Sequence, residues 1–198
     1  MIEIVIASRN EKKVREIKQI TKGIPIKLLP LGSFKDLPEI IEGGKTFQEN
    51  AKKKALTIAN LTGKISLADD SGLEVEALNG VPGIESSRFA KTDKDRIDKL
   101  LGLMKDIPKE KRQAKFVCAV AIALPDNGKV TAVSSECKGT ISFKPRGRGG
   151  FGYDPIFIPE GYSKTFAELS RDAKNRISHR ARAFKKAKKI LLDILSKQ

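Results

Sequence analysis

The sequence predicts an α/β fold with a long mixed β-sheet. In the first half of the chain, strand-like and helix-like segments alternate, which is typical of parallel βα units. In the middle, Asp126-Asn127-Gly128 separates two apolar runs and predicts a hairpin, hence an antiparallel pair. A chain of 198 residues has the length of one domain, and two lobes that share one sheet also fit.

The predicted strands are short runs rich in Ile, Val, Leu and Ala that end at Gly, Pro, Asn or Asp. In chain order they are residues 2–7, 24–31, 64–68, 73–78, 116–124 and 130–136. The run 116–124 is almost continuously apolar, so we expect it at the centre of the sheet. Residues 73–78 partly alternate between apolar and polar, which indicates a strand with one solvated face.

Apolar residues at helical spacing predict four helices. The first follows Ser8-Arg9-Asn10 and ends near Gly23. The second begins at Thr46, whose spacing to Glu49 is that of a capping box, and ends at about Asn60.

The third helix starts at Thr92-Asp93 and stops before Pro108, and the fourth is one long amphipathic helix at the C-terminus. The buried stripe predicted for this last helix consists of Ile177, Ala181, Phe184, Lys188, Leu191 and Leu195, widened by Ile190 and Ile194. Loops are expected at residues 32–44 and 144–153, which are rich in Gly, Pro and charged residues.

The composition narrows the function classes. Hydrophobic residues (39%) are too many for a disordered chain, and their runs are too short to span a bilayer. Residues 2–6 lack the basic lead of a secretory signal, so we expect a cytoplasmic protein. The net charge of +15 suits nucleic acid, an anionic surface or a polyanionic small substrate, and also a lysine-rich solvated surface.

The small numbers of cysteine and histidine residues limit which metals the protein can bind. Cys118 and Cys137, which the predicted hairpin would bring together, are expected to be two buried thiols. With one histidine and two cysteines, a structural zinc cluster is excluded. Any metal must then be held by carboxylates, which indicates a hard ion such as Mg²⁺.

The segment from Ser8 to Lys13 stands between a buried strand and a helix start. Helix N-termini carry unpaired N–H groups and suit phosphate, and Lys13 adds a charge one turn into the helix. The structural alternative is ordinary capping by Ser8 or Asn10. The chain has no Walker A motif, so a P-loop NTPase is not expected.

Three further polar segments interrupt the apolar pattern. Asp69-Asp70-Ser71-Gly72 ends the predicted strand 64–68, where paired carboxylates suit Mg²⁺ and the alternative is a turn. In residues 149–155, glycines around Phe151 and Tyr153 would admit a flat ligand, or the aromatics plug a loop. Residues 174–180 open the predicted last helix, and their lone His179 is more typical of a solvated side chain than of a base.

Taken in order, these segments resemble the inosine/xanthosine triphosphate pyrophosphatase family, also called the HAM1-like or RdgB-like family. The similarity covers nearly the whole chain. The matching motifs are Ser8-Arg9-Asn10-Glu11-Lys12-Lys13, Thr46-Phe47-Gln48-Glu49-Asn50-Ala51, Ala68-Asp69-Asp70-Ser71-Gly72-Leu73, Gly80-Val81-Pro82-Gly83, Gly149-Gly150-Phe151-Gly152-Tyr153-Asp154-Pro155-Ile156-Phe157 and Ser178-His179-Arg180. Arg9 and Lys12 stand where the family often has glycine.

The resemblance implies two helix-flanked α/β lobes around a central cleft, one domain of residues 1–198, and a homodimer. It implies Mg²⁺-dependent hydrolysis of ITP, dITP and XTP to the monophosphate and pyrophosphate. The phosphate-binding residues it implies are Ser8, Arg9, Asn10, Glu11, Lys12, Lys13 and Lys54. Asp70 is the implied general base and metal ligand, supported by Asp69, with Ser71 contacting substrate and Glu42 (or Glu39) as a second metal ligand.

The same resemblance implies a base pocket formed by Phe151, Gly152, Tyr153, Asp154, Lys174, His179 and Arg180. Three alternatives remain at this point: a nucleic-acid-binding protein, suggested by the basic run 180–189; a Maf-like pyrophosphatase; and an inactive relative. The first lacks an RNA-recognition signature, Asn10 argues against the second, and the third would be expected to lack a catalytic carboxylate or lysine.

Overall fold

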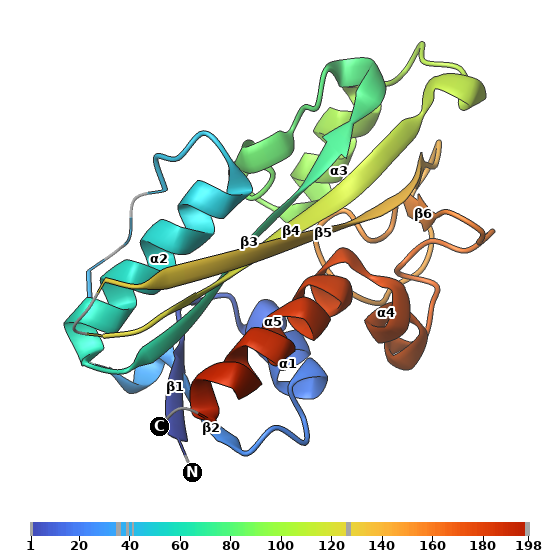
Figure 1. The fold of residues 1–198 in the computed structure, drawn as a ribbon. Coiled ribbons are helices and arrows are strands. Elements are labelled where there is room, and N and C mark those ends of the chain that lie inside the picture. The colour runs from blue at the N-terminus through green and yellow to red at the C-terminus, as the bar shows by residue number, and fades with distance from the viewer. Residues whose placement is uncertain (1, 35–36, 39, 41, 126–127, 197–198) are drawn as a thin grey trace. The chain divides into compact units, whose positions relative to one another are not determined.

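The computed structural model describes residues 2–34, 37–38, 40, 42–125 and 128–196. Within these ranges the sheet has six strands, in the order β2-β1-β3-β4-β5-β6 (Figure 1). The strands are β1 (Ile2–Ile6), β2 (Ile26–Pro30), β3 (Ile65–Val75), β4 (Gln113–Ala123), β5 (Val130–Ile141) and β6 (Phe157–Pro159). The α-helices are α1 (Glu11–Ile20), α2 (Phe47–Thr62), α3 (Asp93–Leu103), α4 (Arg171–Ile177) and α5 (His179–Leu195).

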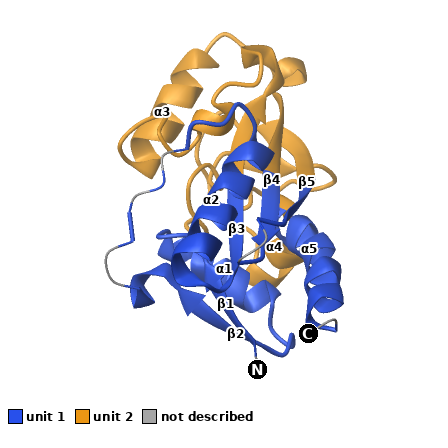
Figure 2. Cartoon of the chain, turned by 60° about the vertical axis from the view of Figure 1, so that its left-hand side comes forward, with its two compact units in different colours: residues 1–70, 118–135, 180–198 blue, residues 71–117, 136–179 orange. Residues whose placement is uncertain are grey.

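The predicted α/β class with a mixed sheet is confirmed. β1 pairs in parallel with both β2 and β3, whereas β5 and β6 are antiparallel. The chain divides into two compact units, shown in different colours in Figure 2. Unit 1 comprises residues 1–70, 118–135 and 180–198, and unit 2 comprises residues 71–117 and 136–179. None of the described helices has both the length and the apolar character that crossing a membrane requires.

In unit 1, α1 and α5 pack on one face of the sheet. Their shared core is formed by alternate residues of β1, β3 and β4 with the apolar stripes of both helices: Ile4, Ile6, Val14, Ile17, Ile65, Leu67, Cys118, Val120, Ile122, Ala183, Phe184, Ala187 and Leu191. Because strand side chains alternate, the intervening residues point to the opposite face. That face is covered by α2.

Helix α2 packs on the sheet through small side chains. Ala51, Ala55 and Ala59 are fully buried, as is Ala68 of β3. Alanines on both sides let a helix lie close to a sheet, so the polar side chains of α2 that share this face reach the strands directly. Thr46 caps the helix by accepting from the backbone N–H of Glu49 at 3.1 Å, as predicted.

In unit 2, α3 packs on one face of the sheet. The core there contains Leu73 and Val75 of β3, Ile97, Leu100 and Met104 of α3, Ala114 and Phe116 of β4, Cys137 and Ile141 of β5, and Tyr153, Ile156, Phe157 and Phe166. The guanidinium of Arg112 is buried nearby and donates to the backbone oxygens of Met104, Ile107, Ile141 and Ser142. Four carbonyls around one cation tie the end of α3 to β5 without a carboxylate.

Several predicted boundaries are wrong, and the largest error concerns the doubled acid. Residues 64–68 and 73–78 are not two strands with a turn between them; one strand, β3, runs from Ile65 to Val75. Asp, Ser and Gly are frequent in turns, but here tertiary partners of the two carboxylates stabilise an extended conformation. β4 also begins earlier than predicted, and β5 extends to Ile141.

The predicted C-terminal helix is also two helices. Ser178 has an extended backbone (φ −66°, ψ 154°) and separates α4 from α5. Ile177 therefore packs against the core of unit 2, whereas Phe184 and Leu191 belong to that of unit 1. Segment 174–180 does not open one helix: its first half ends α4, and α5 begins at His179.

Three local features were also predicted: a capping box at Thr46, two buried thiols and a hairpin. Glu49 does not close a capping box on Thr46, since its Oε2 accepts from the backbone N–H of Lys45 instead. Cys118 and Cys137 are buried thiols outside any disulfide, as expected. The hairpin is closed by the N–H of Leu124 donating to the oxygen of Lys129, and Asp126-Asn127 lies outside the described residues.

Candidate functional site

Asp69 and Asp70 lie in the part of β3 that belongs to unit 1, and both are buried. Successive side chains of a strand point to opposite faces of the sheet. Asp69 therefore shares the face of Leu67, under α1 and α5, while Asp70 shares the face of Ala68, under α2. This arrangement reduces the repulsion between the two carboxylates, and each needs its own cations or hydrogen-bond donors.

The Asp70 carboxylate is held by two side chains of α2. Asn50 Nδ2 donates to Asp70 Oδ2 at 3.1 Å, and Lys54 Nζ lies 3.2 Å from Asp70 Oδ1. The same ammonium donates to Glu42 Oε1 and to the backbone oxygen of Asp69, both at 2.8 Å. We call Glu42, Asn50, Lys54 and Asp70 the α2-side cluster.

Burial and neighbouring charges shift the pKa values of this cluster. Burial raises the pKa of Asp70 above its usual value, and Lys54 and Lys13 oppose the rise only in part. Burial alone would lower the pKa of Lys54, but Asp70, Asp69 and Glu42 together raise it. The cluster thus combines a permanent ammonium ion with a carboxylate that is more basic than usual.

On the other face of β3, Asp69 is the centre of an ion-pair network. Lys13 Nζ lies 3.3 Å and Arg180 Nη2 lies 3.2 Å from Asp69 Oδ2, and Arg180 Nη1 lies 2.6 Å from Glu16 Oε2. Burial alone would raise the pKa of Asp69, yet Lys13, Arg180 and Lys54 lower it well below its usual range. Asp69, ionised at neutral pH, therefore links α1, β3 and α5.

The start of α1 shows the capping that the sequence left as an alternative to phosphate binding. Asn10 is the N-cap, and its Oδ1 accepts from the backbone N–H groups of Lys12 and Lys13 at 3.0 and 3.1 Å. The N–H of Asn10 donates in turn to Ser8 Oγ at 3.2 Å. The phosphate-binding role of this segment stays a prediction.

Two other members of that segment have protein partners. Arg9 Nη2 donates to the backbone oxygen of Leu37 at 2.8 Å and so holds the loop that follows β2. Glu11 pairs with Arg15 one turn later on the exposed side of α1. Since Arg9 is exposed, its charge adds to the positive surface at the start of α1.

A divalent cation would find only oxygen ligands in this cluster. Among the described residues, no group of three or more His, Cys, Asp or Glu side chains could hold a metal. Glu42 and Asp70 nevertheless both contact the Lys54 ammonium, so two carboxylates converge on one positive charge. Mg²⁺ is usually held by one or two carboxylates together with substrate phosphates, so this donor set fits it. The alternative ligand Glu39 lies outside the described residues.

In unit 2, two of the predicted base-binding residues, Asp154 and Lys174, form a buried ion pair. Lys174 Nζ of α4 lies 2.6 Å from Asp154 Oδ2, and the same oxygen accepts from the backbone N–H of Phe151 at 2.8 Å. The ammonium also lies 5.1 Å from the ring centre of Phe151. A Cβ at Gly150 would overlap Asp154 Oδ2, and its φ of +73° favours glycine, so the loop can close over the pair only with glycine there.

The remaining aromatic residues of that loop and helix are part of the core. Tyr153 is 3% exposed, and its hydroxyl donates to the backbone oxygen of Ser86 at 3.1 Å. His179 is buried as well and stacks on Phe116 with ring centres 4.6 Å apart, so the expectation of a solvated histidine is wrong. Of the loop's two aromatics, Phe151 is the one that keeps exposed surface.

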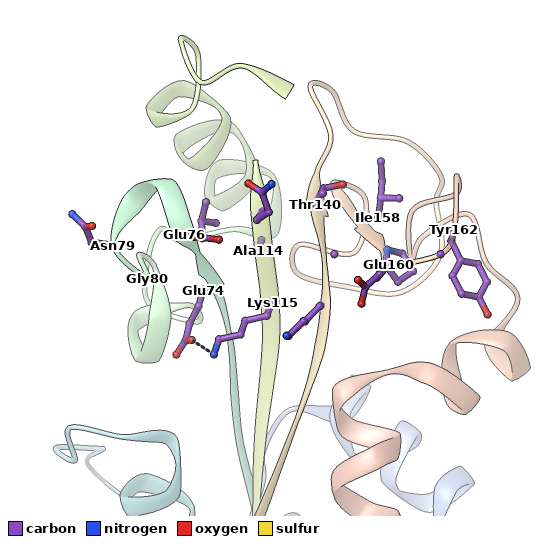
Figure 3. Close-up of a pocket in the computed structure, with 16 residues that line it drawn as sticks. Glu74, Glu76, Asn79, Gly80, Ala114, Lys115, Thr140, Ile158, Glu160 and Tyr162 are labelled. Atoms are coloured by element: carbon purple, nitrogen blue, oxygen red, sulfur yellow. Dashed lines mark ion pairs between the residues drawn. The ribbon is translucent and has the colours of Figure 1, made fainter. Parts of the chain in front are cut away.

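Unit 2 also has a groove that contains none of the predicted site residues (Figure 3). Its volume is about 900 Å³, and it lies over the ends of β3, β4, β5 and β6. Lys115 pairs there with Glu74 at 3.4 Å and with Glu136 at 3.2 Å across neighbouring strands. This is the solvated face of the sheet in unit 2, opposite the face covered by α3.

Comparison with known proteins places this arrangement in a family. The model of the Ham1 family matches residues 4–190. The chain belongs to the Ham1 family. It is 46% identical over 193 residues to a dITP/XTP pyrophosphatase of Desulforamulus reducens, covering 96% of each chain. It is 48% identical over 186 residues to one of Geobacter sulfurreducens, covering 92% of this chain and 93% of that one.

Solved structures of Ham1 proteins have the same fold. A HAM1 protein from Coxiella burnetii superposes with a TM-score of 0.88 at 41% identity, covering 98% of this chain and 100% of that one. The Ham1 protein of Staphylococcus aureus gives a TM-score of 0.86 at 38% identity, covering 96% and 98%.

Within this Ham1 chain, the predicted site residues form separate groups in the two units. Unit 1 contains residues 8–13, Glu42, Lys54, Asp70 and Arg180; unit 2 contains Ser71, residues 151–154, Lys174 and His179. Arg180, predicted with the base-binding residues, pairs with Asp69 and Glu16 of unit 1. The roles of all these residues stay predictions.

Sequence reasoning assigned no role to three residues that hold others in place. Asn50 orients Asp70, Glu16 holds Arg180, and Asp93 accepts from the backbone N–H of Gly152 at 3.0 Å. Only Asn50 carries a signal in the sequence, because it lies one turn before Lys54 on the apolar, alanine-rich side of a predicted helix.

We expect Asp69→Asn to destabilise the protein without being specific to catalysis. It should lower the free energy of unfolding by about 3–5 kcal/mol at pH 7, because the buried guanidinium of Arg180 loses one of its two carboxylates and Lys13 loses its partner. Since the folded-state pKa of Asp69 is depressed, its contribution is complete above the pKa of the unfolded carboxyl and is lost as the pH falls through the folded value. In urea unfolding, the difference from wild type should therefore shrink below about pH 4.

The control for this change is Asp98→Asn, which removes an exposed carboxylate paired with Lys94 on α3. Its unfolding curve should coincide with that of the wild type. Equal losses in both variants, or a difference that persists unchanged into acid, would contradict the role assigned to Asp69.

Proposed function

We propose that this Ham1 protein hydrolyses non-canonical purine nucleoside triphosphates, namely dITP, XTP and ITP, to the nucleoside monophosphate and pyrophosphate. The observation that carries the proposal is the α2-side cluster, in which a basic carboxylate and a fixed ammonium are held together in a buried setting. Its relatives from Desulforamulus reducens and Geobacter sulfurreducens are dITP/XTP pyrophosphatases, which supports the same reaction.

The chemistry follows from these residue types. Water attacks the α-phosphorus and pyrophosphate leaves, so negative charge increases on several oxygens at once. Asp70, whose pKa is raised by burial, orients the water and takes its proton. The ammonium groups of Lys54 and Lys13 offset charge on the phosphate oxygens.

We further propose that Mg²⁺ is the cofactor and that Asp70 and Glu42 hold it. When bound, the ion neutralises charge on the phosphates and aligns them. Lys54 contacts both carboxylates in this structure, so its ammonium would lie beside the ion and add a second positive charge close to the phosphates. A carboxylate that holds metal is a weaker base, so we propose that Asp70 contributes mainly by orienting the water and that proton transfer to it is secondary.

For base recognition, we propose that the ammonium of Lys174 donates to the 6-oxo group of hypoxanthine or xanthine. Adenine has an amine at that position, which offers a donor where the ammonium of Lys174 would donate to the 6-oxo group, so this hydrogen bond would be lost. Asp154 fixes the ammonium at 2.6 Å, so the donor is already positioned before the base arrives. Phe151 offers the base a partly exposed ring beside it.

The central test is pyrophosphate release from dITP, XTP, ITP, GTP and ATP, with Mg²⁺ and with a chelator. We expect release from the first three, and loss of activity when the metal is removed. Asp70→Asn should lower kcat by about 100-fold or more, because it removes both the base and a metal ligand. Asp98→Asn, the same chemical change on the surface of α3, should not alter it.

Two results would contradict the proposal. Equal rates on ATP and ITP would show that the enzyme is not selective for non-canonical bases. A decrease of less than about tenfold in kcat for Asp70→Asn would show that this carboxylate is not the catalytic one.

Base recognition has its own prediction. Lys174→Met should lower kcat/KM for ITP and XTP by about 10- to 100-fold, equivalent to about 1.4–2.8 kcal/mol, and leave the rate on ATP unchanged. Lys164→Met is the matched control, because Lys164 is exposed in the same unit. A uniform loss on all nucleotides, or a fall in melting temperature that accounts for it, would assign Lys174 a structural role instead.

We propose, finally, a cytoplasmic homodimer, located where its nucleotide substrates are. The solvated sheet face in Figure 3 supports self-association, because Tyr162 at its edge is 44% exposed and a second copy would cover it. Light scattering at micromolar concentration should give twice the chain mass. Tyr162→Asp should shift the mass toward that of the monomer, and a wild-type monomer would contradict the proposal.

A further inference from the structure

The side-chain amide of Asn50 donates one hydrogen bond and accepts another. Its amide nitrogen donates to Asp70 Oδ2 at 3.1 Å, and its amide oxygen accepts from the backbone N–H of Gly44 at 2.8 Å. The side chain is 1% exposed. One planar amide therefore connects the carboxylate of β3 with the loop that carries Glu42.

Gly44 lies in direct contact with this amide. A Cβ at Gly44 would lie 2.7 Å from Asn50 Oδ1 and 2.8 Å from the Cβ of Glu49, closer than such atoms approach in proteins. Gly43, its neighbour, has nothing within 4 Å of the corresponding position. The loop can therefore rest on Asn50 only with glycine at position 44.

Two further bonds hold the same loop against the start of α2. Glu49 Oε2 accepts from the N–H of Lys45 at 2.7 Å, and Thr46 Oγ1 accepts from the N–H of Glu49 at 3.1 Å. Consecutive residues of the loop are thus held by side chains of the first helical turns. Glu42 is two residues upstream of this anchored segment and reaches Lys54 at 2.8 Å.

We propose that Asn50 is a positioning residue that sets the separation and orientation of the Glu42 and Asp70 carboxylates, so that together they bind a divalent cation. The inference rests on the proposed function for the identity of the reaction, but the geometry concerns the carboxylates themselves. To make both bonds, a side chain of this length needs a donor and an acceptor side by side at its tip, as an amide has. Aspartate would lack the donor, and leucine would lack both.

The Asn50 amide would not contact the metal itself. It acts by orienting the two carboxylates that do. Hydrogen bonds to ligating carboxylates fix their orientation, and losing such a bond typically weakens metal affinity or activity about 10- to 100-fold. Here the bond to Asp70 directs one carboxylate, and the bond to Gly44 limits where the loop can place the other. Either end can be broken separately, which makes the inference testable.

The experiment compares Asn50→Leu, which removes both bonds, with Gly44→Ala, which leaves Asn50 intact but pushes the loop away. Gly43→Ala is the matched control, since the same methyl group would enter open space one residue earlier. The first measurement is Mn²⁺ binding without nucleotide, by electron paramagnetic resonance. The second is kcat and KM for dITP, and the third is the melting temperature of each variant.

We expect Asn50→Leu and Gly44→Ala to weaken Mn²⁺ binding by about 10-fold or more and to lower kcat at saturating Mg²⁺, with a smaller change in KM for dITP. Gly43→Ala should match the wild type in all three measurements. If Asn50→Leu does not fold, Gly44→Ala against Gly43→Ala still decides the question.

Wild-type Mn²⁺ affinity in Gly44→Ala or in a folded Asn50→Leu would overturn the proposal. Equal losses in Gly44→Ala and Gly43→Ala would also overturn it, because any change in the loop would then suffice. A wild type that binds Mn²⁺ but does not hydrolyse dITP would contradict the proposed function and not this inference, since the binding comparison would still hold.

Discussion

The structure of unit 1 depends on how two adjacent, buried carboxylates are compensated. On the same side of a strand, Asp69 and Asp70 would repel each other strongly in a low-dielectric interior. The alternation of β3 separates them onto opposite faces, where each meets a different helical layer. α1 and α5 must then bring cations to one face, and α2 must bring a cation and an amide donor to the other.

This separation gives neighbouring residues different chemistry. Asp69 is surrounded by Lys13 and Arg180, so its pKa is low and its charge is fixed. Asp70 meets one ammonium and one amide in a buried setting, so its pKa is raised. A strand that placed both on one face would give a coupled pair with a shared proton instead. Structural ion pairing and reactivity are therefore assigned to different residues of one motif.

Local sequence patterns predict much of this fold. The errors lie where contacts with residues distant in the sequence determine the backbone conformation. The strand and helix periods of β1, α1, α2 and α3 are visible in the sequence because each has one apolar face. The sequence places residues 69–72 between two predicted strands because Asp, Ser and Gly favour turns, whereas Asp69 in the extended strand is paired with Arg180, 111 residues away. The break at Ser178 was missed for the same reason, since a helical period continues through it while the flanking residues pack into different cores.

Buried polar side chains carried the most information about the candidate site. Replacing a buried ion pair by packed apolar residues is often neutral or stabilising, so stability alone does not require Lys54 beside Asp70, or Lys174 beside Asp154. Each lysine lies on a helix face that otherwise packs against the core, where an apolar residue would fit the pattern. Asn50 shares that face with Lys54, and its two bonds join the Asp70 carboxylate to the loop that carries Glu42. Helix α2 therefore supports the sheet through its alanines and organises the α2-side cluster through the two polar residues among them.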